Sequence, residues 1–409
     1  MESHHINSKD VLDSMDRCTK CGICNSYCPV ANNSDQFPGP KYSGPQAERF
    51  RAIENVLEIS SDLCNGCGIC MSVCPNNVAI TDIIAHSKSN IANKEKKITF
   101  LQKLLNRPYL IGRIGNLFPS FSNFILHNRF FRWLSGLLLN LDSEAPLPYF
   151  AGDKFKIFSS KIRIDQNKKN IFYFSGCAVD NYDPDVGIAA SKLMSFLGYN
   201  VITNPGLCCS LPMFSSGEWD VAEYRAKKTI KSLSDSLNSA QSIISTSTSC
   251  SLTIKKKYSA YINLSDESST KVSKSIFDIC EYLVENHFED VSKKMKSVDK
   301  KIIYHGPCQL RNHGMGQPAV ELLRQIPNIS IHLSEADCCG VGGTFGNIGG
   351  KADISRSIGK GLMDQVEEVK PDLILCDSET CRWNIEKSSG IKTIHPIQLI
   401  LESLGLKNQ

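Results

Sequence analysis

Short apolar stretches alternate with longer helical patterns from about residue 169 to the end of the chain. The stretches "NIFYFSG", "NVITN" and "SIISTSTS" have the length and β-branched content of buried strands, whereas "PDVGIAASKLMSFLGY" and "EWDVAEYRAKKTIKSLSDSL" have helical periodicity. Strands that alternate with helices in this way predict right-handed βαβ units on a parallel sheet.

The same order of elements then recurs. "KIIYHGP", "ISIHLSEAD" and "DLILCDSET" repeat the three strands, and "QPAVELLRQI" repeats a helix. Three cysteines of the second copy follow their counterparts at spacings of 131, 130 and 131 residues, namely Cys308 after Cys177, Cys338 after Cys208 and Cys381 after Cys250. We therefore predict a duplicated α/β cysteine-rich module with a parallel sheet, the first copy over residues 166–295 and the second over residues 296–409.

The first 95 residues are predicted to be mainly helical. In "GPQAERFRAIENVLEIS" one helical face carries the apolar side chains, and Pro45 stands near the first turn; the apolar residues are Ala47, Phe50, Ile53, Val56 and Leu57. We place a helical domain over residues 1–95 and expect a multidomain chain, because 409 residues exceed what one compact core usually holds.

Residues 96–165 form a different kind of segment. From Lys96 to Leu141 there is no Asp or Glu, and basic residues alternate with apolar ones, as in "NRFFRWLSGLLLNL"; the basic residues are Lys96, Lys97, Lys103, Arg107, Arg113, Arg129 and Arg132. This pattern favours either an interfacial helix lying on anionic lipid or a linker whose apolar face packs between domains. Pro108, Pro119 and the interspersed charges argue against a spanning helix.

The overall composition is that of an ordinary globular protein, with 41% hydrophobic and 22% charged residues. The segment "MESHHINSKDVLDSMDR" has neither an apolar core nor a small-residue cleavage site, so we expect a cytoplasmic protein with reduced thiols. A net charge of +4 is too small to predict nucleic-acid binding. Only the eighteen cysteines are unusual.

Eight of these cysteines stand in two copies of one run. "RCTKCGICNSYCPV" and "LCNGCGICMSVCPN" both have the spacing CxxCxxCxxxCP. That spacing is typical of bacterial ferredoxins, in which the fourth cysteine of each run binds the other cluster. We expect one 4Fe-4S cluster on Cys18, Cys21, Cys24 and Cys74, and a second on Cys28, Cys64, Cys67 and Cys70. Zinc sites use paired cysteines with a longer spacer and fit this spacing poorly.

The remaining cysteines follow the predicted strands of the duplicated modules, where parallel sheets usually bind ligands. Each copy has a single cysteine, an adjacent pair and a late cysteine; they are Cys177, Cys208, Cys209 and Cys250 in the first, and Cys308, Cys338, Cys339 and Cys381 in the second. Both sets can converge on a pocket and bind a further iron-sulfur cluster, carry out thiol redox chemistry or serve a structural role. Gly340 would let the backbone approach a bulky cofactor, and Cys280 is expected to pack as a small apolar residue.

Taken together with "FPGPKYSGPQAERFR", "YHGPC", "ADCCGVGGTFG", "ETCRWNIE" and "IHPIQLI", the cysteine runs resemble the iron-sulfur subunits of flavin dehydrogenases and heterodisulfide reductases, and among them the C subunits of anaerobic glycerol-3-phosphate dehydrogenases. One departure is that the late CxxC of related modules is absent, since Ser247 and Ser378 stand three positions before Cys250 and Cys381, with Cys376 displaced by two.

The resemblance implies an electron-transfer subunit with no flavin or substrate site of its own. Such a subunit receives electrons from catalytic flavoprotein subunits that oxidise glycerol-3-phosphate and passes them to menaquinone, peripherally bound at the inner face of the cell membrane. Three alternatives remain open at this point: the iron-sulfur subunit of a glycolate- or lactate-type dehydrogenase, a heterodisulfide-reductase-like thiol-redox protein, and a zinc-binding scaffold.

Overall fold

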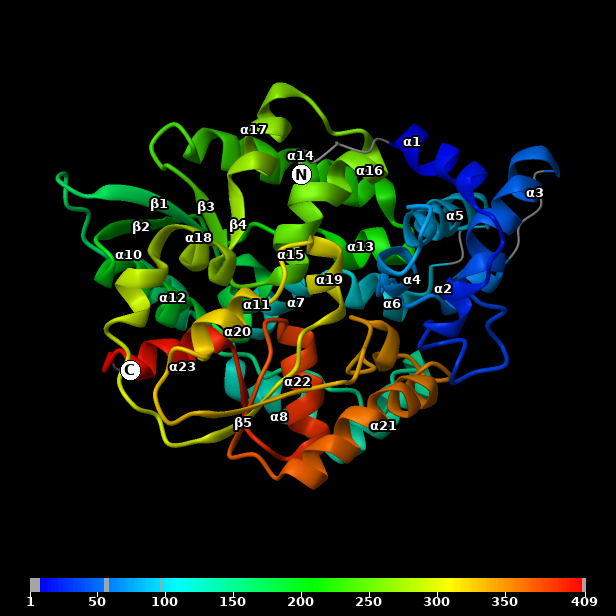
Figure 1. Ribbon diagram of the computed structural model, residues 1–409. Helices are drawn as coiled ribbons and strands as arrows, with labels where there is room; N and C mark the ends of the chain where they lie inside the picture. Colours follow the sequence, from blue (N-terminus) through cyan, green and yellow to red (C-terminus); the bar gives the residue numbers. More distant parts are fainter. Residues whose placement is uncertain (1–7, 55–58, 96–97, 407–409) are drawn as a thin grey trace.

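Two four-stranded parallel sheets organise the chain after residue 168 in a computed structural model that describes residues 8–54, 59–95 and 98–406 (Figure 1). The first sheet has the order β2-β1-β3-β4, with β1 Lys169–Phe174, β2 Tyr199–Thr203, β3 Ile243–Ser245 and β4 Ile276–Asp278. The second has the order β6-β5-β7-β8, with β5 Lys301–Tyr304, β6 Ser330–Leu333, β7 Leu373–Leu375 and β8 Thr393–Ile394. The predicted duplication of a parallel α/β module is confirmed.

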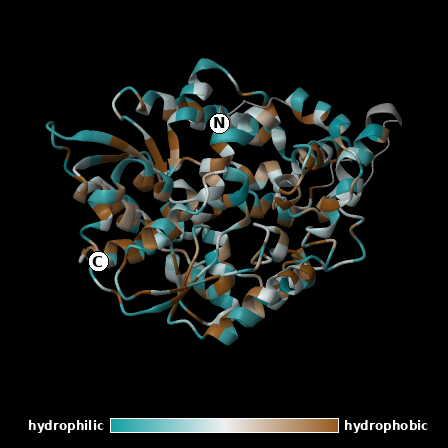
Figure 2. Cartoon of the chain, in the orientation of Figure 1, coloured by the Kyte–Doolittle hydropathy of each residue, from teal (hydrophilic) through white to brown (hydrophobic). Residues whose placement is uncertain are grey.

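The central strands are buried on both faces, as the apolar runs predict. Phe172 of β1 pairs with Ile243 of β3, and Ile303 of β5 pairs with Ile374 of β7. Figure 2 shows hydrophobic residues along the strands of the first module. The predicted strands are shorter than expected, since β3 and β7 end after three residues and the chain turns into the loops that carry the late cysteines.

Helices connect the strands in both modules. The first contains α11 Gly176–Asn181, α12 Pro184–Phe196, α13 Leu211–Ser216, α14 Trp219–Ser236, α15 Thr248–Leu252, η4 Thr253–Lys257, α16 Tyr258–Ile262, α17 Glu267–Ser275 and α18 Ile279–Ser292. The second contains α19 Cys308–His313, α20 Pro318–Leu323, η5 Phe345–Asn347, α21 Ala352–Val369, α22 Glu379–Ser389 and α23 Pro396–Ser403. Cys280 lies in α18 as predicted, but residues 276–278 before it form the edge strand β4, which the helical pattern concealed.

The N-terminal part is mainly helical, as predicted. Its elements are α1 Ser8–Asp13, η1 Ser14–Arg17, α2 Ile23–Ser26, η2 Tyr42–Gln46, α3 Ala47–Glu54, η3 Ile59–Leu63, α4 Ile69–Ser72 and α5 Ile80–Glu95. The helix expected between the two cysteine runs is α3, and Pro45 lies in the preceding turn η2. Val56 and Leu57 lie outside the described residues, as do Lys96 and Lys97.

The basic apolar segment folds into a series of short helices: α6 Phe100–Leu105, α7 Pro108–Gly115, α8 Pro119–His127, α9 Arg129–Leu139 and α10 Lys154–Ser160. Pro108 and Pro119 each stand at the first position of a helix, where a missing N–H costs nothing. Within the described residues, none of the helices has the length and apolar character needed to cross a bilayer.

Shared cores join these parts. Val186 of α12 and Leu283 of α18 pack in one cluster with Val320 of α20 and Ile397 of α23, so the two modules bury their helices against each other. A second cluster joins Ile80, Ile83 and Ile84 of α5 to Phe214 and Trp219 of the first module. The N-terminal cysteines are therefore held at a fixed position relative to the modules.

Candidate metal centres

The two cysteine runs fold into the same turn. In each run a one-turn helix, α2 or α4, follows a glycine with positive φ, +87° at Gly22 and +76° at Gly68. The residue two positions earlier also has positive φ in both runs, +60° at Lys20 and +71° at Gly66. Such a backbone curls the chain around a common centre, so the first three cysteines of each run face inward together.

The fourth cysteine of each run lies with the first three of the other. Burial, and then the neighbouring thiols of Cys18, Cys74 and Cys21, raise the pKa of the Cys24 thiol. Burial, and then the thiols of Cys67, Cys64, Cys28 and Cys24, likewise raise the pKa of Cys70 well above its usual value. Each group contains the four sulfurs of the crossed arrangement, and Cys24 of the first group also lies near Cys28 and Cys70 of the second. The division into two ligand sets stays a prediction.

The chemistry of both donor sets fits a 4Fe-4S cluster, which takes four thiolate ligands. A small cavity lined by Cys28, Cys64, Cys67 and Cys70 lies within the second set. Burial, and then the closeness of other thiols, disfavour the charged thiolate, which is why the pKa values of Cys24 and Cys70 are raised. Positive charge on bound iron would remove that penalty.

The two sets differ in their access to solvent. Cys21 is exposed, and Cys18 and Cys74 are half-buried, whereas all four cysteines of the second set are buried. Exposed Ile23 and Tyr27 flank the first set. The first set therefore faces the surface and the second lies inside, toward the modules.

In the first module, four thiols form a chain of close contacts. Cys177 lies at the start of α11, the pair Cys208–Cys209 precedes α13, and Cys250 lies in α15. A hydrogen bond from Cys177, and one from Cys209, lower the pKa of Cys208. The Sγ atoms of Cys250 and Cys209 are 3.1 Å apart. The Ser210 backbone N–H also points at the Cys208 sulfur, at 3.4 Å.

The second module repeats this chain and extends it by one sulfur. Hydrogen bonds from Cys308 and Cys339 lower the pKa of Cys338, and those from Cys339 and Cys376 lower the pKa of Cys381. Cys376 directly follows β7 and is 0% exposed. Cys376 is not among the predicted site residues, because its spacing from Cys381 does not match the late CxxC. Among the described residues, hydrogen bonds join thiols only within each module, so two separate sets result.

Gly340 has a structural role that was not expected. Its φ is +94°, and a Cβ atom there would lie 2.1 Å from the backbone oxygen of Ser355 in α21. The close approach that requires a glycine at this position is thus to a helix of the same module. Ser210 holds the equivalent position in the first module, also with positive φ, +63°.

The second thiol set and the second module lie close together. Burial and the thiol of Cys338 are the two largest causes that raise the pKa of Cys67, and the Asn312 side chain donates a 2.8 Å hydrogen bond to the Cys67 carbonyl. A hydrogen bond with Cys338 and burial raise the pKa of the Cys308 thiol, and the nearby thiol of Cys67 raises it further. The buried N-terminal set is therefore the neighbour of the second module's five sulfurs.

Cys280 is fully buried, but it packs beside two carboxylates. Where the two modules meet, the Cys280 Sγ atom and one carboxylate oxygen each of Asp278 and Asp377 all lie within 4.8 Å of one another. Tyr304 donates a 2.7 Å hydrogen bond to Asp377, and Thr248 a 3.1 Å one to Asp278. Burial and then the neighbouring Asp377 raise the pKa of Asp278 to about 8. The sequence gives no sign of this cluster, because its members come from β4, α18 and the loop after β7.

Comparisons with known families agree with this division of the chain. Residues 14–78 match the 4Fe-4S dicluster domain, and residues 171–255 and 302–386 each match the cysteine-rich domain. The chain therefore belongs to the iron-sulfur proteins in which a 4Fe-4S dicluster domain precedes two cysteine-rich domains. The predicted pair of 4Fe-4S clusters is confirmed at this level.

Among these proteins, the chain is similar to the C subunit of the anaerobic glycerol-3-phosphate dehydrogenase of Escherichia coli K12, with 29% identity over 96% of this chain and 99% of the relative. It is also similar to the glycolate oxidase iron-sulfur subunit of the same organism, with 23% identity over 95% and 93%. A third relative is the D subunit of the dihydromethanophenazine:CoB–CoM heterodisulfide reductase of Methanosarcina acetivorans, with 24% identity over 97% and 95%. The resemblance seen in the sequence is confirmed, and each of these relatives is named as one subunit of an oxidoreductase.

Proposed function

We propose that this chain is the iron-sulfur electron-transfer subunit of a membrane-associated flavin dehydrogenase, and that it passes electrons from anaerobic glycerol-3-phosphate oxidation to the menaquinone pool. The observation that carries the proposal is the arrangement of two four-thiol sets, one at the surface and one inside beside the second module. The full-length similarity to a glycerol-3-phosphate dehydrogenase subunit supports the choice of substrate.

In this proposal the ligands of the surface cluster are Cys18, Cys21, Cys24 and Cys74, and those of the inner cluster are Cys28, Cys64, Cys67 and Cys70. Bound clusters supply one-electron steps between a two-electron flavin and a two-electron quinone. The chain's own residues fix the two sites relative to each other through the core around α5. The five sulfurs around Cys338 and the four around Cys208 are proposed as sites for a further metal centre.

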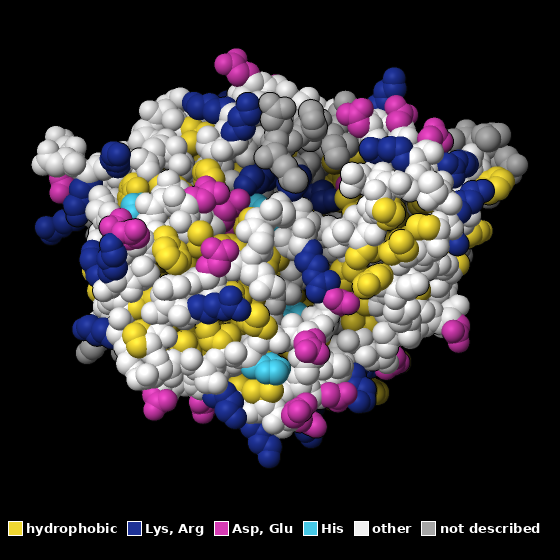
Figure 3. Space-filling model, in the orientation of Figure 1, with side chains coloured by type: hydrophobic (Ala, Val, Ile, Leu, Met, Phe, Trp, Pro, Cys, Tyr) yellow, Lys and Arg dark blue, Asp and Glu magenta, His cyan; other side chains and the backbone are white. Residues whose placement is uncertain are grey.

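The surface set is the proposed entry point for electrons from the catalytic flavoprotein subunits. Its exposure, with Ile23 and Tyr27 beside it, is what a docking partner needs to bring a flavin close. On the face shown in Figure 3, charged side chains of both signs are interspersed, and hydrophobic side chains gather over the N-terminal domain at the right of the view. We also propose the domain limits that the sequence predicts, which are residues 1–95, 96–165, 166–295 and 296–409.

The proposed membrane contact is the apolar helical face, which we define as the exposed large hydrophobic side chains of residues 100–149. Fourteen of the twenty-three exposed large hydrophobic side chains among the described residues belong to it: Phe100, Leu104, Leu110, Ile114, Leu117, Phe118, Phe121, Phe124, Ile125, Phe130, Trp133, Leu137, Leu138 and Tyr149. An apolar set of this size on short amphipathic helices suits insertion into the headgroup region of a bilayer.

Not all basic residues of this segment are available to lipid. Arg132 is buried and donates 2.6 Å hydrogen bonds to the carbonyls of Ser143 and Ala145. Arg107 forms a 3.0 Å ion pair with Glu218. Lys103, Arg113 and Arg129 are exposed and can meet anionic headgroups. We propose peripheral binding at the cytoplasmic face of the cell membrane on this basis.

A second candidate is the iron-sulfur subunit of a hydroxy-acid dehydrogenase, which the similarity to the glycolate oxidase subunit favours. The two differ in the partner flavoprotein and its substrate. A thiol-redox role would use the module thiols, and a zinc scaffold would carry no acid-labile sulfide.

Anaerobic purification tests the common part of the proposal. We expect about eight irons and about eight sulfides per chain from the two N-terminal clusters, and more if a module binds a further centre. The purified chain is then combined with the candidate flavoproteins, and bleaching of the visible absorption is followed after adding glycerol-3-phosphate, glycolate or lactate. Bleaching by glycolate or lactate alone would reject the first substrate, and zinc without iron or sulfide would reject electron transfer.

A further inference from the structure

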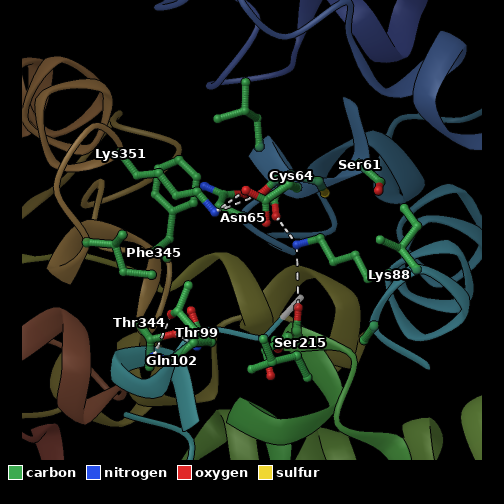
Figure 4. A pocket seen from close by; sticks show the side chains of 18 of the residues that line it. Ser61, Cys64, Asn65, Lys88, Thr99, Gln102, Ser215, Thr344, Phe345 and Lys351 are labelled. Atoms are coloured by element: carbon green, nitrogen blue, oxygen red, sulfur yellow. Dashed lines mark hydrogen bonds and ion pairs between the residues drawn. The ribbon is translucent and has the colours of Figure 1, made fainter. Parts of the chain in front are cut away.

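A cavity of about 690 Å³ lies where several parts of the chain meet. Its wall includes residues 61–65 of the second cysteine run, α5, the start of α6, the end of α13 and the loop 342–351 of the second module. Figure 4 shows Lys88 crossing one side of this cavity, between Cys64 and Ser215, with Thr344, Phe345 and Lys351 on the opposite side.

The cavity offers hydrogen-bond donors that have no partner inside the protein. The Ser61 hydroxyl and the Asn65 amide nitrogen are buried without a hydrogen-bond partner among the described residues, and Ser61 is only 1% exposed. Lys88 donates to the carbonyls of Cys64, at 2.6 Å, and Ser215, at 3.4 Å. An ammonium group has three protons, so one remains for a ligand. Buried polar groups left unpaired are costly, which favours a ligand that carries acceptor oxygens.

The rest of the wall favours a ligand with an apolar body. Lys351 is paired with Asp62 at 2.7 Å, so its charge is balanced. Ile91, Ile98 and Phe345 line the remaining wall. Carbonyl oxygens on a flat apolar ring match this combination of a few donors and aliphatic or aromatic walls.

The position of the cavity connects the inner thiol set with the apolar helical face. Cys64 lines this cavity and also the small cavity formed with Cys28, Cys67 and Cys70. At the other side, Thr99 directly precedes α6 and Asn140 directly follows α9, and both line the cavity. A ligand dissolved in the membrane would thus enter between the two ends of the segment that carries the apolar helical face.

We propose that this cavity binds the head group of a quinone, whose carbonyl oxygens accept hydrogen bonds from Ser61, Asn65 and Lys88. The choice of a quinone rests on the proposed function, whereas the binding site rests on the donors and walls of the cavity. In this arrangement the ring lies against Cys64, within contact distance of the inner thiol set.

Calorimetry on the full chain, purified without oxygen with its iron and sulfide, tests the proposal. The probe is dimethylnaphthoquinone, whose quinone ring has no free position for thiol addition. Ser61→Ala removes a hydroxyl that has no partner in the protein, so it should leave folding intact and weaken binding about tenfold, the effect of one lost hydrogen bond. Lys88→Gln should weaken binding at least as much. The matched control is Ser87→Ala, because the Ser87 hydroxyl is equally buried and unpartnered on α5 but does not line the cavity.

Weaker binding by Ser61→Ala with unchanged binding by Ser87→Ala supports the site. Equal affinities of the unaltered chain and both serine variants would overturn it, as would the absence of binding to a chain that carries its full iron and sulfide. Iron and sulfide are measured on the same samples. Their loss from the unaltered chain would reject the proposed function, while the comparison of affinities still decides whether the cavity binds a quinone.

Discussion

Replacing Phe118 and Phe121 by serine tests whether the apolar helical face binds membranes. These side chains are 73% and 65% exposed at the start of α8, so the protein interior loses little when they are replaced. Phe118 stands at the N-cap of α8, where serine is itself a preferred residue. The folded state should therefore survive the double change.

The effect on membrane binding follows from the exposed area. A phenylalanine side chain buries about 200 Å² when fully removed from water, so about 140 Å² of each ring is open to insertion. At about 25 cal/mol per Å², the two rings contribute about 7 kcal/mol if inserted completely. With half of that area inserted, the loss is about 3.5 kcal/mol, or roughly 300-fold in the partition constant.

The assay is co-sedimentation with vesicles that contain phosphatidylglycerol, repeated with purely zwitterionic vesicles and at raised salt. The matched control is Tyr224→Ser, because Tyr224 is 72% exposed but lies on α14, outside the apolar helical face. We expect binding to fall for the double variant alone, and to fall with salt for the unaltered chain because Arg113 and Arg129 meet anionic lipid. Equal partitioning of all three proteins would refute the membrane assignment.

Three further predictions concern the thiol sets and the core. Cys74→Ala should remove the surface cluster with about four irons and leave the inner cluster, and Cys28→Ala should remove the inner cluster and leave the surface one. Iron counts and the spectra of the reduced proteins check both variants. The crossed pairing would be rejected if Cys74→Ala removed the inner cluster, or Cys28→Ala the surface cluster. The pKa of Asp278 is raised to about 8, so the folded state keeps a proton that the unfolded chain releases above about pH 4. This contribution to stability is therefore complete below about pH 4 and is lost as the pH rises through 8. Urea midpoints measured across this range should therefore fall less steeply for Asp278→Asn, and an unchanged slope would contradict the assignment. Phe214→Ala should lower the free energy of unfolding by about 3–5 kcal/mol, because the ring is fully buried in the core shared with α5. A loss below about 1 kcal/mol would show that this core does not hold the domains together.

The cysteine runs and the duplicated modules could be predicted because their signals are local. CxxCxxCxxxCP places thiols on one turn whatever surrounds it, and the strands of both modules are continuous apolar runs. Edge strand β4 was missed because it has only three residues and runs directly into α18. Its sequence alone does not separate it from the helix that follows.

Side-chain roles that depend on distant neighbours could not be predicted. Arg132 counts as a basic residue of an interfacial pattern, yet it holds the chain after α9 through two backbone carbonyls. Gly340 was expected to let the backbone approach a cofactor, and the structure shows that the backbone of α21 also requires a glycine there. In both cases the partner lies on another part of the chain, and no spacing pattern indicates which part that is.

The sequence by itself determined that the chain has two ferredoxin-type cysteine runs and which parts of the chain repeat, because thiol spacing and apolar periodicity act over a few residues. Tertiary structure alone decided which thiol set faces the surface, that Cys376 joins the second module's sulfurs, and that donors from η3, α5 and the cysteine run surround one cavity. Those relations come from packing between segments hundreds of residues apart, and packing is decided by the shape and burial of whole elements.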